Sequence, residues 1–226
     1  MIATMQLADV GPVKALSLFR QRPRAGRVPG LRKANFGIAA PFGSGLVRPP
    51  QFGRVGLVAM WDDDAAVDDY FSTHPFARGL EHGWRVRLEP LRMHGSWPGV
   101  PSDLPKARTL HEDGPFVTLT IANLRPSQTL RFFRVNASAE KGVLDTRGNI
   151  WATAVALPPF LSSWSLWESE DSIAEYAFRP GGNHANAILE QRRKDFHKES
   201  AFIRFRPYKS EGSVAGRNPL PPGALP

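Results

Sequence analysis

Cysteine is absent from this chain of 226 residues, and its absence excludes several kinds of site at once. Without a thiolate there can be no disulfide, no iron–sulfur cluster, no thiolate-ligated or c-type haem and no cysteine nucleophile. The lack of cysteine is compatible with a cytoplasmic protein, which is the location that we expect.

Targeting, membrane and catalytic motifs are missing too. The first ten residues are typical of a strand rather than of a signal peptide, and no apolar run approaches the length of a membrane span. The chain contains no His-Glu-x-x-His zinc motif, no Gly-x-Ser-x-Gly nucleophile motif and no glycine fingerprint for a dinucleotide. Zinc enzymes, serine hydrolases and flavin or NAD enzymes are therefore unsupported.

Positive charge is plentiful: the formal net charge is +8 and the pI is about 10.3. A cluster of basic residues lies between positions 20 and 33, namely Arg20, Arg22, Arg24, Arg27, Arg32 and Lys33. Such a cluster favours an anionic partner, either nucleic acid or an acidic membrane. No nucleic-acid-binding module accompanies it, so nucleic acid is the weaker hypothesis. A solvated loop, or a surface for acidic lipid or haem propionates, remains open.

The chain contains an internal repeat that recurs in three blocks. In the first block, Thr4, Ala8, Pro12, Leu16, Phe19 and Arg20 recur at a constant offset as Thr118, Ala122, Pro126, Leu130, Phe133 and Arg134. In the second, Trp61 and Tyr70 recur as Trp167 and Tyr176 with unchanged spacing. In the third, the segment 86–90 recurs as 203–207. Three blocks in one order indicate a duplication.

Each copy predicts the order strand, helix, strand, strand, helix, strand. The first copy has strands near 2–8, 33–40, 54–61 and 84–93 and helices near 12–21 and 64–82. The second has strands near 116–122, 148–156, 162–168 and 201–208 and helices near 126–135 and 170–197. This is the ferredoxin-like pattern. We therefore predict an α+β protein in which two fused ferredoxin-like (βαββαβ) repeats form an α+β barrel, as a pseudo-dimer.

The composition also predicts where the repeats begin and end. The first repeat covers 1–97 and the second covers 116–209, the copy with an extended helix and a haem site. Residues 98–115 contain several prolines and little apolar periodicity, which is typical of a linker. The Pro-rich segment 210–226 is expected to be a disordered tail.

The two copies differ most in length around their second helix. Eleven more residues separate Tyr176 from Ile203 than separate Tyr70 from Val86. Asn183 in this longer segment is a good helix N-cap, which places His184 near the first helical position.

The partial positive charge at that position disfavours imidazolium. His184 should therefore be neutral and offer a lone pair to a metal or a haem iron. From the residues alone, a histidine that only caps or packs is slightly favoured.

Two other residues are candidates for a cofactor site, and each also has a simpler structural explanation. Arg192 follows His184 by two turns and could reach a haem propionate, although a solvated arginine is favoured. Trp167 could wall an apolar pocket with Trp151, Phe160 and Trp164, although aromatic residues in strands are more often core.

Two further groups have structural roles as the better explanation. Asp62, Asp63 and Asp64 recur as acidic residues beside Trp167, so they are expected to start a helix rather than to act in catalysis. His197 is expected to end the long helix.

With these segments assembled, the chain resembles the spheroidene monooxygenase family of carotenoid-biosynthesis enzymes. The resemblance is carried by Phe19 and the basic segment after it, the segments 28–31 and 41–45, Trp61 to Asp63, His184 on its helix, Glu199 and the segment 202–207. More distantly, the duplicated fold is similar to that of dimeric α+β barrel haem proteins such as chlorite dismutases and aldoxime dehydratases. In those proteins a histidine on a helix of the C-terminal half ligates iron.

This resemblance implies a haem-dependent monooxygenase that inserts a hydroxyl or keto oxygen into an apolar, carotenoid-like substrate. It implies haem b with His184 as the axial ligand of the iron, with Arg192 and Trp167 in the cofactor site. Electrons would come from an external donor, a separate reductase or a ferredoxin. A membrane-dissolved substrate would favour a peripheral contact with the inner membrane face. A haem-dependent lyase of the aldoxime-dehydratase type and a cofactor-free α+β barrel without catalysis stay open.

Overall fold

The computed structural model describes residues 1–42, 50–106, 114–178, 195–220 and 225. Its elements are β1 (Ile2–Asp9), α1 (Pro12–Gln21), β2 (Leu31–Ala40), β3 (Arg54–Trp61), α2 (Asp64–Thr73), α3 (Pro75–Gly79), β4 (Trp84–Gly95), β5 (Phe116–Leu124), the 3₁₀ helix η1 (Pro126–Gln128), α4 (Thr129–Leu144), β6 (Asn149–Leu157), β7 (Phe160–Trp167), α5 (Glu170–Phe178) and β8 (His197–Glu211).

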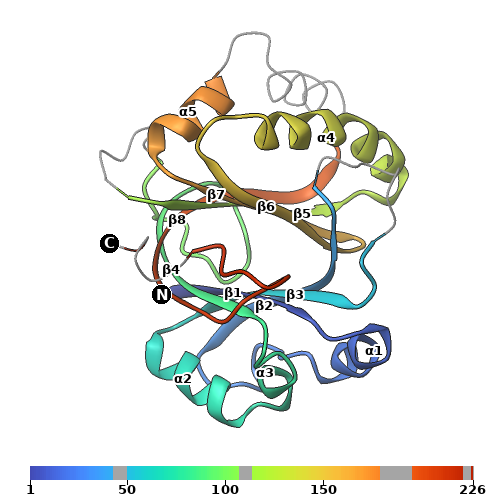
Figure 1. Ribbon diagram of the computed structural model, residues 1–226, viewed down its shortest axis with the longest axis vertical. Helices are drawn as coiled ribbons and strands as arrows, with labels where there is room; N and C mark the ends of the chain where they lie inside the picture. The colour runs from blue at the N-terminus through green and yellow to red at the C-terminus, as the bar shows by residue number, and fades with distance from the viewer. Residues whose placement is uncertain (43–49, 107–113, 179–194, 221–224, 226) are drawn as a thin grey trace.

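The described strands close into one barrel in the order β1-β3-β2-β6-β7-β5-β8-β4, with every neighbouring pair antiparallel. Each half keeps the ferredoxin-like order, and the halves join where β2 pairs with β6 and β4 pairs with β8. Figure 1 shows α1, α2 and α3 covering the outer face of one sheet, and α4 and α5 covering that of the other. The predicted α+β barrel of two fused repeats is confirmed.

Strand periodicity gives each sheet two differently used faces, because successive side chains point to opposite sides. Alternate residues such as Met5, Leu7, Leu119 and Trp164 point into the barrel and are at most 1% exposed. Each such fully buried large side chain contributes about 1.5–3 kcal/mol to folding. Side chains of the described strands, of the segment after β4 and of the C-terminal segment form one apolar cluster in this interior.

The helix-facing side is organised differently in the two halves. In the first half a single apolar cluster joins α1, α2 and α3 to the sheet. In the second half the described residues form two smaller clusters. One gathers around Phe132 and Phe196 and the other around Phe116 and Trp167.

Helix boundaries correct three sequence-based expectations. The helix expected over 64–82 ends at Thr73 and resumes as α3, because Pro75 interrupts it and His74 Nδ1 accepts from the Phe76 N–H. The helix expected over 126–135 extends to Leu144. His197 does not end a helix. It begins β8 and packs edge-on against Phe132, with the ring centroids 5.5 Å apart.

The expectation of a disordered tail is wrong for residues 210–220. Strand β8 continues to Glu211, and Val214 and Leu220 are 4% and 0% exposed within the barrel cluster. Asn218 Oδ1 accepts hydrogen bonds from Ser210 Oγ and from the Leu220 N–H, both at 2.9 Å. In Figure 1 this segment returns between the two sheets. Its few apolar side chains therefore help to fill the barrel interior.

We expect Leu220→Ala to lower the free energy of unfolding by about 2–5 kcal/mol, because the side chain is fully buried in the barrel cluster. Leu130→Ala is the matched control, since that leucine is 62% exposed and should change stability by less than about 0.5 kcal/mol. Urea unfolding followed by tryptophan fluorescence measures both. Equal effects of the two changes would mean that the C-terminal segment is not part of the core.

Candidate functional site

The repeat places a buried Trp–Tyr pair under the second helix region of each half. Trp61 lies against Tyr70 with ring centroids 4.8 Å apart, and Trp167 lies against Tyr176 at 5.7 Å. Each indole N–H donates to a hydroxyl at 2.9 Å, from Trp61 to Thr4 and from Trp167 to Ser165. Trp167 is thus a helix-facing residue of the second sheet.

Trp167 does not share a pocket with the other aromatic residues predicted beside it. Phe160 and Trp164 belong to the barrel cluster, and Trp151 packs against that cluster. Trp167 instead belongs to a cluster with Phe116, Val143 and Ile173. The sheet therefore separates Trp167 from these three residues, and only Trp167 remains a candidate for a site under the helices.

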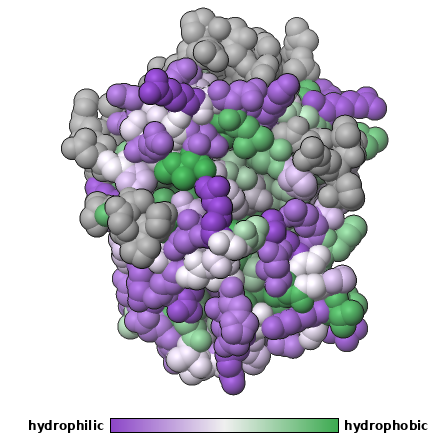
Figure 2. Space-filling view, viewed as in Figure 1, coloured by the Kyte–Doolittle hydropathy of each residue, from purple (hydrophilic) through white to green (hydrophobic). Residues whose placement is uncertain are grey.

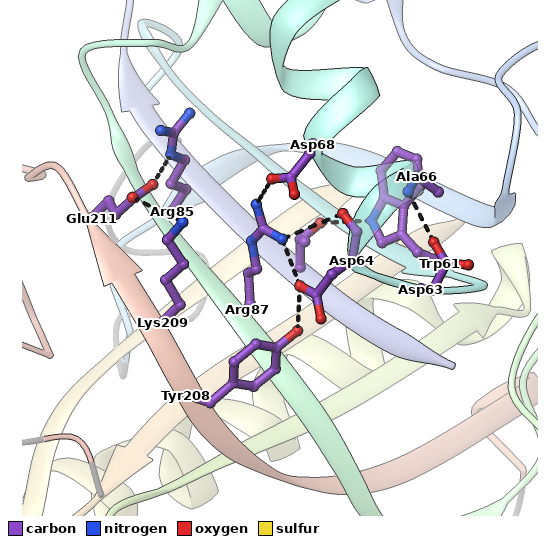
Figure 3. Close-up of polar contacts among 11 residues, drawn as sticks. Trp61, Asp63, Asp64, Ala66, Asp68, Arg85, Arg87, Tyr208, Lys209 and Glu211 are labelled. Carbon is purple, nitrogen blue, oxygen red and sulfur yellow. Dashed lines mark hydrogen bonds and ion pairs between the residues drawn. The ribbon is translucent and has the colours of Figure 1, made fainter.

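The acidic residues after Trp61 cap helix α2 and form ion pairs with a buried arginine (Figure 3). Asp63 caps the helix by accepting from the Ala66 N–H at 2.9 Å, which confirms its expected helix-start role. Arg87 has a side chain only 7% exposed and lies between the carboxylates of Asp64 and Asp68. The Tyr208 hydroxyl donates to Asp64 at 2.9 Å. The positive charge of Arg87 is therefore balanced by two carboxylates.

The same position in the second half carries Arg204, with different surroundings. Its guanidinium pairs with Glu170, the counterpart of Asp64. The counterpart of Asp68 is Ala174, which has no carboxylate. Arg92 lies opposite Arg204 in the β4–β8 register. Burial, and then the charge of Arg92, lower the pKa of Arg204 to about 10.

Two buried polar atoms beside this arginine have no hydrogen-bond partner. They are Arg204 Nε and Thr118 Oγ1, and both residues come from strands that pair with each other. Thr118 and Arg204 are direct cross-strand neighbours, so these two groups are close. In the first half the counterpart hydroxyl, on Thr4, is used by Trp61. The first half has two unpartnered buried atoms of its own, Gln6 Nε2 and the Tyr70 hydroxyl, so among the described residues the halves differ in where such atoms lie: only the second half has them at this threonine and arginine.

The middle of the second sheet also carries smaller side chains. Leu57 and its cross-strand partner Phe36 are buried under the helices of the first half. Ser163, which precedes Trp167 by the same spacing, pairs with Ala154. Both are half-buried and lie between the two small apolar clusters. The described side chains thus fill less space on this face, as a bound planar or elongated group would require.

A separate cleft of about 590 Å³ opens where the two halves meet, between the end of α1 in the first half and the turn from β6 to β7 in the second. Its apolar lining includes Phe19, Phe36, Leu57, Leu157 and Phe160, and its basic residues are Arg22, Arg24 and Lys33. The Arg22 guanidinium lies 4.4 Å from the centre of the Phe19 ring. Part of the predicted basic cluster therefore borders an apolar cleft.

His184 and Arg192, the predicted axial ligand and propionate contact, lie outside the described residues. The flanking residues are described. Phe178 ends α5, and Phe196 and His197 pack on Phe132 of α4. Burial lowers the pKa of His197. The described residues on either side of this segment in the sequence therefore belong to the helix-covered side of the second half.

Arg204, Thr118 and Ser163 are candidate residues that no motif in the sequence predicted. A signal existed, because the repeat alignment sets Ala174 against Asp68 and Ser163 against Leu57. The absence of a carboxylate and of a large apolar residue at these positions marks the second half as the one that differs.

No family model matches this chain. A spheroidene monooxygenase of Rubrivivax gelatinosus is 30% identical to it over 227 residues, which cover 96% of this chain and 86% of that protein. The chain belongs to the spheroidene monooxygenase family. A spheroidene monooxygenase of Rhodobacter capsulatus is 28% identical over 186 residues, covering 79% of this chain and 76% of that protein. As a member of the spheroidene monooxygenase family, this chain is an oxygenase.

A solved structure of an aldoxime dehydratase in complex with butyraldoxime shares the fold. The TM-score is 0.53 at 8% identity, and the match covers 92% of this chain and 79% of that chain. This similarity supports the duplicated barrel fold.

We expect Asp68→Asn to destabilise the protein at neutral pH, because Arg87 holds the pKa of the Asp68 carboxyl below its ordinary value of 3.8. A lowered pKa stabilises the fold above the ordinary value, and this contribution is lost as the pH falls through the folded-state pKa. The variant and the wild type should therefore converge in acid. Asp69→Asn, at the exposed neighbouring position, is the control. Urea midpoints across pH 2–7 check this, and a gap that persists at the lowest pH would contradict it.

Proposed function

We propose that this chain is a haem-dependent monooxygenase that inserts a hydroxyl or keto oxygen into an apolar, carotenoid-like substrate. The observation that carries the proposal is the 30% identity, over nearly the whole chain, to a protein named spheroidene monooxygenase. Haem b is the cofactor, and an external donor, a separate reductase or a ferredoxin, supplies the electrons.

The second half fits haem better than the first half does. Leu57 and Phe36 are buried on the helix-facing side of the first sheet and line the cleft beside α1, whereas the smaller Ser163 and Ala154 occupy the matching positions in the second sheet. Trp167 borders this region with an apolar ring, and Arg204 and Thr118 bring unused polar atoms. In this proposal His184 is the axial ligand of the iron and Arg192 contacts a propionate.

When bound, the haem supplies the activation of oxygen, and the chain supplies position and environment. The two apolar clusters, around Phe132 and around Trp167, exclude water from both ends of the helix-facing region. A neutral His184 would hold the iron through its lone pair. The apolar substrate would be oriented by packing, since it has no polar group for a hydrogen bond.

Visible absorbance during hemin titration tests the cofactor and its ligand together. We expect wild-type protein to take up about one equivalent with a Soret band, and His184→Ala to bind at least about tenfold more weakly or with a shifted band, about 1.4 kcal/mol or more. His82→Ala is the matched control, because that side chain is 93% exposed in the first half. No stoichiometric uptake would overturn the haem proposal. Unchanged hemin binding by His184→Ala would mean that another residue is the axial ligand.

Product analysis separates the oxygenase from the lyase. With an acyclic carotenoid, oxygen and a reductant, a monooxygenase gives a product that contains one added oxygen atom from O₂. An aldoxime-dehydratase-type lyase has no such requirement for oxygen. Turnover of an aldoxime with no oxygenation of carotenoid would favour the lyase.

We also propose an anionic membrane as the peripheral partner, contacted through α1. Exposed apolar residues gather there: Val13 is 85% exposed, Leu16 66% and Phe52, before β3, 59%. Figure 2 shows hydrophobic residues at the right-hand margin, where Figure 1 places α1. The helix and the turn after it also carry Lys14, Arg20, Arg22 and Arg24. Apolar residues flanked by positive charge fit an acidic bilayer surface.

None of the described helices is long and apolar enough to span a bilayer.

Vesicle sedimentation tests this surface. We expect the protein to bind phosphatidylglycerol vesicles more than phosphatidylcholine vesicles and to be released by salt. Leu16→Ser should weaken binding several-fold, since it removes an exposed apolar residue beside the basic cluster. Leu144→Ser, at a 47% exposed position that ends α4, is the control. Equal binding by both variants and the wild type would exclude α1 as the contact.

A further inference from the structure

We propose that Arg204 and Thr118 form a carboxylate-binding site on the helix-facing side of the second sheet. This inference rests on the proposed function for its occupant, a haem propionate. The site itself rests on described side chains from two paired strands, Thr118 on β5 and Arg204 on β8.

The two halves of the molecule provide an internal comparison for this site. Arg87 and Arg204 occupy the same position in their repeats and are both buried, at 6% and 4% exposure. Arg87 is held by the carboxylates of Asp64 and Asp68. Arg204 is held by Glu170, and Ala174 stands where the second carboxylate would be. The second repeat has therefore kept the buried arginine and lost one of its two anions.

The remaining charges near Arg204 increase this imbalance. Among the described charged groups, those that act on Arg204 are Arg92 and Glu170. Glu170 also acts on Arg92. Glu170 thus acts on both guanidinium groups, in a partly buried region where charge is poorly screened. A ligand group that enters here is stabilised if it is negatively charged.

The geometry of the two free donors fits a carboxylate in particular. Arg204 Nε carries one N–H and Thr118 Oγ1 can donate one O–H, and neither atom has a partner in the described structure. The residues are direct cross-strand neighbours, so both donors can reach the two oxygens of one carboxylate. In the first half the corresponding hydroxyl already has a partner, because Thr4 Oγ1 accepts the Trp61 indole N–H.

Thr118→Val separates a ligand role from a structural one. Valine has the shape of threonine, and the hydroxyl that it removes has no partner in the apoprotein. The apoprotein should therefore unfold at the same or a higher temperature, whereas hemin affinity should fall about tenfold. Thr4→Val is the matched control. It removes the hydroxyl bonded to Trp61, so it should lower apoprotein stability and leave the preference for hemin unchanged.

The decisive readout is the affinity for hemin relative to hemin dimethyl ester, which has the same ring without the carboxylates. We expect the wild type to prefer hemin by about tenfold or more, and Thr118→Val to lose most of this preference. Arg204→Lys, which keeps a positive charge beside Glu170 but removes Nε, should lose it as well. Dodecanoate, followed by its effect on the unfolding temperature, tests a fatty-acid carboxylate as the other source of the same group.

Each outcome decides between these possibilities. Equal binding of hemin and its ester by the wild type, or an unchanged preference in Thr118→Val, would overturn the site while leaving the haem proposal intact. No binding of either porphyrin would overturn the haem proposal and the propionate as occupant. In that case stabilisation of the wild type by dodecanoate, lost in Thr118→Val, would support the carboxylate site with a fatty acid as its ligand.

Discussion

Closure of the two sheets through the β2–β6 and β4–β8 pairs is the constraint on which the rest of the structure depends. Closure turns one face of every strand inward, and the inward side chains form a single apolar cluster from both halves. The C-terminal segment adds Val214 and Leu220 to that cluster. Because side chains fill protein interiors at close to crystalline density, the haem proposed above would lie outside the barrel, between a sheet and its helices.

Duplication then offers two such places, and the residues show which one has changed. The first half has a continuous apolar cluster and an arginine held by two carboxylates. The second half has two separated clusters and an arginine held by one. A protein that needs only one site can use one copy to stabilise the barrel and let the other lose packing. The divergence is consistent with that division of roles.

Much of the fold was predictable from the sequence because two local signals agreed. Period-two burial marked the strands, and the recurrence of Trp61 and Tyr70 as Trp167 and Tyr176 fixed the repeat. The predictions failed where only a few residues determine whether a segment is packed. The Pro-rich composition after Ser210 concealed that Val214 and Leu220 reach the barrel interior.

The candidate site was less predictable, for a physical reason. His184 was proposed from helix-terminus chemistry that is local in sequence, and it stays a prediction because it lies outside the described residues. Arg204 and Thr118 are far apart in sequence and become neighbours only through strand register. Trp167 stays a predicted cofactor contact, and its separation from Trp164 required knowing which face of β7 each residue occupies.

The small side chains and the two separate apolar clusters among the described residues of the second half have a consequence for stability as well as for binding. Unpartnered polar atoms and small side chains lower the stability of the region that contains them. A ligand that binds only the folded form restores stability in proportion to the logarithm of its concentration over its dissociation constant. Such a region would be more stable when occupied, so the proposed haem would contribute to the fold of the second half. The first half depends instead on Arg87, its carboxylates and its continuous apolar cluster.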